Sequence, residues 1–229
     1  MNYPQPPWNL KGYAIQTLNL LDVERSRQFI PSELEIVSVL PGKTLGGVYL
    51  SGYGEGSLLQ YNELIVVAGL TRYQNKIGSW ISHIYVDNEI SVAGGREIWQ
   101  LPKEMTDFSW ESDSAIASAK EGQVTVKQSD LLFCQLEYKK EWYQPSTWWL
   151  QEIAADAFSG LDTELWQFNN RFKCKFEWLS GQVQIPESSP FASLNLERPL
   201  LTIKMNQLDL IAGKPEIMGK KSNSQLILN

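Results

Sequence analysis

Hydrophobic and polar residues alternate along most of this chain, and the alternation predicts strands. Short alternating or apolar runs cover residues 12–21, 34–40, 44–50, 63–70 and 78–86. They recur at 108–111, 115–120, 124–128 and 131–138, and again at 200–205 and 208–211. In the clearest run, 168–178, aromatic residues and Cys174 fall on one face and charged residues on the other. Residues 183–185 are predicted to pair with this run through a turn at Ser180-Gly181.

Two of these runs carry additional information. Residues 63–70 are apolar apart from Glu63, which predicts a strand that is covered on both faces. The pair Gly46-Gly47 at the start of 44–50 predicts a bulge or a close approach of another backbone segment.

Helices are predicted at only two places. Asp22 can cap a short helix over 23–29 that ends before Pro31. Asn88 can cap a second helix, which contains Gly94-Gly95. Two glycines inside a helix cost roughly 1 kcal/mol each relative to alanine, so we expect a neighbouring backbone to pass close to them.

Length and composition are typical of one globular domain. With 229 residues, 43% hydrophobic and 20% charged, the chain is expected to form a single domain over 1–229. Prolines stiffen an extended arm at 1–10, which Trp8 is expected to anchor. Residues 219–229 are expected to be a tail that is mobile or docks on a neighbour.

Charge and residue content disfavour several functional classes. A net charge of −6 argues against nucleic-acid binding, and the chain lacks an apolar run long enough for a membrane span. It opens without the features of a secretory signal, so a cytoplasmic location is expected. Cys134, Cys174 and the single histidine, His83, lack ligand spacing. We therefore expect no metal site, two buried thiols and a structural histidine.

Residues 85–104 resemble the signature of the acetoacetate decarboxylase family. The matching positions are Tyr85, Asp87-Asn88-Glu89, Gly95-Arg96-Glu97 and Pro102-Lys103. The resemblance implies a mainly β fold, a closed antiparallel cone or barrel with a few short flanking helices. It also implies a cofactor-free lyase, usually a homo-oligomer, that acts on a small keto acid by decarboxylation or by aldolase- or dehydratase-type chemistry.

The same resemblance implies that Lys103 forms a Schiff base with the substrate. A lysine amine attacks a ketone only when it is neutral, and an unperturbed lysine, with a pKa near 10.4, is almost wholly charged at pH 7. The site must therefore favour the neutral amine, by burial against groups such as Trp99 or through a nearby cation. Glu63, in the family's Tyr-x-Glu position, is implied to move protons, although it could instead be a solvated carboxylate.

The sequence also departs from the family pattern. Glu104 stands where a second lysine follows the catalytic one, and a carboxylate near the amine would favour its charged form. Gly12 stands where an arginine is expected, and Val48 or Tyr49 stands where a second acidic residue is expected. We include Tyr49 among the residues expected to contact substrate. Arg96 and Glu97 either form buried salt bridges or face the pocket, where Arg96 would favour a neutral amine or hold a substrate carboxylate.

A second resemblance, carried by 6–8, 11–12, 44–47 and 63–70, is to the plant neoxanthin-deficient branch of this superfamily. It implies an alternative to catalysis, in which an apolar pocket binds a carotenoid or a lipid-like molecule. The nine tryptophans fit that alternative. The aromatic segment 142–149 is open to three interpretations, as part of the core, a subunit contact or a lid. A purely structural oligomer is a third possible role.

Overall fold

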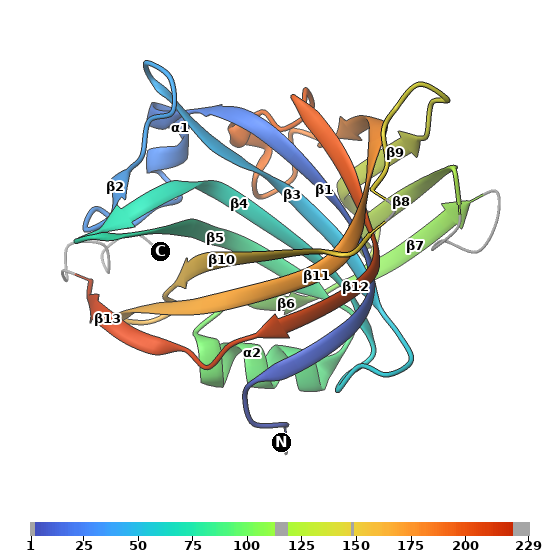
Figure 1. Cartoon of the computed structure of the whole chain (residues 1–229). Coiled ribbons are helices and arrows are strands. Elements are labelled where there is room, and N and C mark those ends of the chain that lie inside the picture. Colours follow the sequence, from blue (N-terminus) through green and yellow to red (C-terminus); the bar gives the residue numbers. More distant parts are fainter. Residues whose placement is uncertain (1–2, 113–118, 148, 222–229) are drawn as a thin grey trace.

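The structure is a computed structural model that describes residues 3–112, 119–147 and 149–221 (Figure 1). Its elements are β1 (Trp8–Asp22), α1 (Val23–Arg27), β2 (Glu35–Ile36), β3 (Lys43–Tyr53), β4 (Tyr61–Tyr73), β5 (Lys76–Val86), α2 (Glu89–Trp99), β6 (Lys103–Met105), β7 (Asp107–Ser112), β8 (Glu121–Gln128), β9 (Leu131–Lys139), β10 (Gln151–Ser159), β11 (Glu164–Gln184), η1 (Ala192–Leu194), β12 (Leu201–Ala212) and β13 (Glu216–Lys220). The run 115–120 and the predicted tail 219–229 lie mostly outside the described residues, and Gly219 and Lys220 of that tail belong to β13, which pairs with β11.

Seven strands form a closed ring in the order β10-β5-β4-β3-β1-β12-β11, and β10 closes it by pairing with both β5 and β11. Neighbours are antiparallel except at β10–β5. The long strand β11 continues out of the ring and pairs with β9, which extends the sheet through β8 to β7. Helix α2 lies across one end of the ring (Figure 1). The predicted closed, mainly β cone with short flanking helices is confirmed.

Several ring strands are buried on both faces. Tyr49 and Ile65 belong to an apolar cluster inside the ring. Their neighbours Leu50 and Leu64 belong to a second cluster, which also contains side chains of β8 and β9 such as Val126. Because successive side chains of a strand point to opposite faces, β3 and β4 separate two cores. The predicted double burial of 63–70 is confirmed.

Local signals account for the helix starts and the close approaches. Asp22 accepts a hydrogen bond from the Glu24 amide, and Asn88 accepts one from the Ser91 amide, as predicted for the two caps. Gly47, with φ +152°, lies against the Thr17 carbonyl, which confirms the predicted backbone approach. In α2 the prediction was wrong about the neighbour, because Gly94 makes room for the Trp8 side chain instead of a backbone segment.

Two other predictions about strand connectivity were wrong. Ser180-Gly181 forms no turn, since β11 runs straight through it and residue 181 pairs with Tyr138 of β9. Gly181 is required there because a Cβ would collide with Thr202. The runs 200–205 and 208–211 form one strand, β12, whose ladders with both neighbours shift register next to Gln207, at φ +52°.

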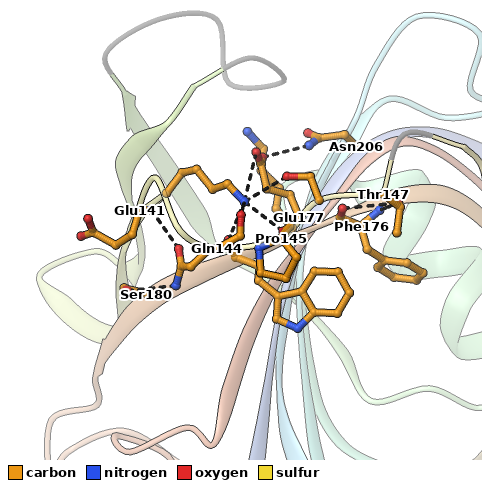
Figure 2. Close-up of polar contacts among 12 residues, drawn as sticks. Glu141, Gln144, Pro145, Thr147, Phe176, Glu177, Ser180 and Asn206 are labelled. Atoms are coloured by element: carbon orange, nitrogen blue, oxygen red, sulfur yellow. Dashed lines mark hydrogen bonds and ion pairs between the residues drawn. The ribbon is translucent and has the colours of Figure 1, made fainter.

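The described aromatic side chains of the segment 142–149 are not part of the core. The exposed fractions are 92% for Trp142, 65% for Tyr143 and 59% for Trp149. Polar contacts hold the backbone of the segment against β11 (Figure 2). Lys140 Nζ donates to the Gln144 carbonyl at 2.7 Å, and the Thr147 amide donates to the Phe176 carbonyl at 2.8 Å. The backbone of the segment is therefore well tied to the barrel while the rings of Trp142, Tyr143 and Trp149 face outward.

The cysteines and the histidine have apolar surroundings. Cys134 and Cys174 are free and buried, as predicted, and burial raises the pKa of their thiols to about 12 and about 11. His83 contacts the Phe29 and Phe191 rings, and burial lowers its pKa to about 4. These groups are uncharged near neutral pH.

Candidate functional site

A cavity of about 290 Å³ lies inside the ring, and all seven ring strands contribute to its wall. Apolar and aromatic side chains make up most of the lining, including Trp8, Ile81 and Phe168. The exposed residues Ile153 and Ala155 of β10 belong to the same wall. The cavity therefore opens beside β10 and extends inward to the connection between α2 and β6.

Lys103 reaches the inner end of this cavity because of how α2 joins β6. The helix ends at Trp99, and Gln100 turns the chain with a left-handed backbone, φ +51°. After Pro102, β6 pairs in parallel with β5, and Lys103 lies opposite Ile84. Since side chains of a strand alternate, Lys103 points inward and Glu104 points to solvent.

The Lys103 ammonium is almost completely enclosed, with its side chain 4% exposed. Its Nζ donates to Glu63 Oε1 at 2.8 Å and to Ser91 Oγ at 2.9 Å. It also lies 5.0 Å from the centre of the Tyr61 ring and 5.8 Å from the Trp8 ring. The carboxylate and both ring faces stabilise a positive charge, so these contacts favour the charged amine at rest.

Glu63 is held by a short chain of hydrogen bonds. Tyr53 donates its hydroxyl proton to Glu63 Oε2 at 3.2 Å. The hydroxyl oxygens of Tyr49 and Tyr53 are also 3.2 Å apart, and because the proton of Tyr53 is directed at Glu63, Tyr49 is the donor between them. Burial raises the pKa of both tyrosines, so they remain protonated donors. One carboxylate oxygen is thus fixed by Tyr53, and the other faces Lys103.

The structure brings four of the seven site residues selected from the sequence to this cavity: Lys103, Glu63, Trp99 and Tyr49. The other three are exposed and lie outside its wall. Arg96 donates through Nη1 to the backbone carbonyl of Lys103 at 3.1 Å, and Glu97 accepts a hydrogen bond from the Tyr3 hydroxyl. The geometry supports neither the buried salt bridges nor the pocket-facing roles considered for Arg96 and Glu97.

Four contacts of the site were not anticipated from the sequence: Tyr53, Tyr61, Ser91 and Trp8. Strand periodicity carried a signal for the first two, because Tyr53 shares a strand face with Tyr49, and Tyr61 shares one with Glu63. Ser91 and Trp8 come to Lys103 through the packing of α2 on β1, which no local pattern reveals. Within residues 3–112, 119–147 and 149–221, we find no metal-like cluster of three or more His, Cys, Asp or Glu, nor any helix suited to crossing a membrane.

Comparison with solved structures places this architecture among known folds. A structure of acetoacetate decarboxylase aligns with a TM-score of 0.72 and 15% identity, covering 95% of this chain and 91% of that one. Acetoacetate decarboxylase from Legionella pneumophila aligns with a TM-score of 0.71 and 13% identity, covering 96% of this chain and 90% of that one. The enduracididine biosynthesis enzyme MppR, complexed with pyruvate, aligns with a TM-score of 0.70 and 12% identity, covering 93% of this chain and 91% of that one. At these identities the likeness concerns the fold alone.

Sequence comparison gives closer relatives over a shorter stretch. Protein NEOXANTHIN-DEFICIENT 1 from Solanum lycopersicum is 34% identical over 109 residues, which cover 48% of this chain and 37% of that protein. The protein of the same name from Arabidopsis thaliana is 32% identical over 107 residues, which cover 47% of this chain and 38% of that protein. The matched stretch thus spans less than two fifths of each relative. The family model described as acetoacetate decarboxylase (ADC) matches residues 2–154, and the chain belongs to the acetoacetate decarboxylase family.

Proposed function

We propose that this protein is a cofactor-free enzyme that forms a Schiff base between Lys103 and the carbonyl group of a small molecule. One observation carries the proposal: a primary amine lies in the wall of an apolar cavity with a carboxylate 2.8 Å away. The amine is the nucleophile of such a reaction, and the carboxylate is the group that can take and return its proton.

The resting ion pair must first transfer a proton from Lys103 to Glu63. The pair has no net charge before or after this transfer, but two separate charges in apolar surroundings cost more than two neutral groups. A substrate that fills the cavity and displaces water therefore favours the neutral amine. Tyr53, through its hydrogen bond to Glu63 Oε2, keeps the other oxygen directed at the reaction centre.

The steps that follow balance in atoms and charge. The neutral amine of Lys103 adds to the carbonyl carbon, and a proton moves from nitrogen to oxygen to give a carbinolamine. Glu63 then protonates the hydroxyl group, which leaves as water, and the product is an iminium ion beside the restored carboxylate. The iminium withdraws electrons from a neighbouring bond, as lyase chemistry requires.

Borohydride trapping tests the proposal. The protein is incubated with pyruvate, acetoacetate or 2-octanone, reduced with sodium borohydride, digested and analysed by mass spectrometry. We expect a stable adduct on Lys103 that is absent in K103R, whose guanidinium cannot form it. The exposed Lys11 serves as a control for non-specific labelling. Absence of a Lys103 adduct with all three carbonyl compounds would refute the proposal.

The paired state of Lys103 favours a second candidate, a non-catalytic binder of an apolar ligand. In that role the Lys103–Glu63 pair is structural, and the apolar wall supplies the affinity. The binder predicts that geraniol, a small neutral terpenoid, quenches tryptophan fluorescence equally in the wild type and in K103M. Absence of a carbonyl adduct in the wild type, together with equal geraniol binding by the wild type and K103M, would favour the binder over the enzyme.

A further inference from the structure

The charges along the cavity wall are few. Among the described residues that line it, only Lys103, Glu63 and Asp156 carry a formal charge. Asp156 lies between two lining alanines of β10, so its side chain points outward, where it accepts a hydrogen bond from Asn169 at 3.0 Å. The single lining cation, Lys103, is already paired with Glu63, so a bound carboxylate would meet one like charge and no spare cation.

The nearby basic residues face away from the cavity. Phe168, Asn170, Phe172 and Phe176 of β11 line the cavity at alternate positions, so Arg171 and Lys173 point outward from the same strand. Arg96 is exposed and donates to a backbone carbonyl. The segments outside the described ranges contain neither lysine nor arginine. No side-chain cation is therefore in place to hold an acidic substrate.

The Schiff base itself leads to the same conclusion. Once Lys103 becomes an iminium ion, its positive charge is balanced by the carboxylate of Glu63 at the same site. A neutral carbonyl compound leaves this pair without net charge. A keto acid would add an unpaired carboxylate to apolar surroundings, which is strongly unfavourable.

We infer that the substrate is an uncharged, largely apolar ketone or aldehyde, and that the cavity discriminates against keto acids. This inference rests on the proposed Schiff-base function and departs from the keto acid expected from the sequence. A cavity of about 290 Å³ has room for on the order of ten heavy atoms, if each takes about the volume of a water molecule. Neutral polar groups in the wall, such as Gln16, Ser79 and Asn170, can bind a hydroxyl or a second carbonyl group.

An uncharged substrate also limits the reaction. Without a carboxylate to lose, the iminium draws electrons from an adjacent C–H or C–C bond. In the simplest case, Glu63 takes a proton from the α-carbon, and the electron pair of that bond forms an enamine. Return of a solvent proton reverses the step, so the enzyme exchanges α-protons of its ketone with the solvent.

A matched pair of compounds tests the inference. We compare 2-octanone with 2-oxooctanoate, which has the same chain and a carboxylate, in the borohydride assay at equal concentration. Labelling of Lys103 is normalised to that of free Nα-acetyl-lysine, because a keto acid is intrinsically more electrophilic. We expect at least about 30-fold more adduct from the ketone. We also expect deuterium exchange at the α-carbons of 2-octanone that is lost in K103R.

Two variants locate the discrimination. N170K places a cation in the wall and is expected to raise labelling by 2-oxooctanoate several-fold. N169K, at the neighbouring exposed position outside the lining, is the matched control and should leave it unchanged. Equal or stronger normalised labelling by the keto acid overturns the inference and leaves the Schiff-base function intact. Labelling by neither compound overturns both.

Discussion

Breaking the Lys103–Glu63 pair should cost far more than breaking a surface ion pair. Both side chains are about 95% buried, at 4% and 5% exposed, and their charged atoms lie 2.8 Å apart. Removal of one partner leaves the other as an uncompensated buried charge, which typically costs about 3–5 kcal/mol of the free energy of unfolding. We predict a loss of this size for K103M and for E63Q.

A double-mutant cycle identifies the cause of the loss. The variant E63Q/K103M has no buried charge to compensate, so its loss should be at least about 2 kcal/mol smaller than the sum of the single losses.

Urea unfolding at pH 7, followed by circular dichroism, measures all three variants. K11M is the control, because Lys11 and Asp209 lie 3.9 Å apart and are 47% and 39% exposed, and such a pair contributes less than about 1 kcal/mol. Single losses no larger than that of K11M, or strictly additive ones, would show that the buried pair is not charged at rest. The interpretation of its contacts would then have to be abandoned.

Three further predictions concern the surroundings of the site. G95A should abolish adduct formation on Lys103, because the added Cβ would lie 2.7 Å from Lys103 Cε; unchanged labelling by mass spectrometry would show that the side chain can shift at no cost. His83 should lower the wild-type free energy of unfolding by about 2 kcal/mol between pH 7 and pH 5. Its imidazole has a pKa near 6.5 in the unfolded protein and gains a proton over this range, whereas in the folded protein its pKa is lowered to about 4 and it stays neutral. H83F should lack this component in urea titrations, and an identical pH slope would contradict the assignment. Cys134 and Cys174 should react with a thiol reagent only after unfolding, and fast reaction of the native protein would contradict their burial.

The sequence predicted the parts of the fold that depend on local chemistry. The caps at Asp22 and Asn88 and the double burial of β4 follow from side-chain type and periodicity alone. The turn at Ser180-Gly181 was wrongly predicted because glycine is required there by a neighbouring strand, not by a change of chain direction. The exposure of Trp142 could not be read from its hydrophobicity, since burial depends on which other segments cover it.

The candidate site was predictable only as far as its motif reached. The signature singled out Lys103, and the Tyr-x-Glu pattern singled out Glu63, but neither indicates which groups surround them. Arg96 and Glu104 illustrate the difficulty, because Arg96 belongs to the motif and Glu104 adjoins it, and yet both point away from the cavity. The orientation of Lys103 and Glu104 depends on the parallel pairing of β6 with β5, a long-range contact that the pattern of residues does not encode.

That pairing has a consequence for how the connection between α2 and β6 can vary in length. β6 has only three residues and lies at an edge of β5, so a single-residue deletion between Gln100 and Pro102 would shift its register by one. The glutamate would then replace the lysine at the inner end of the cavity, and the amine would reach bulk water. Among homologues that keep the lysine, we therefore expect substitutions in this connection to be tolerated far better than insertions or deletions.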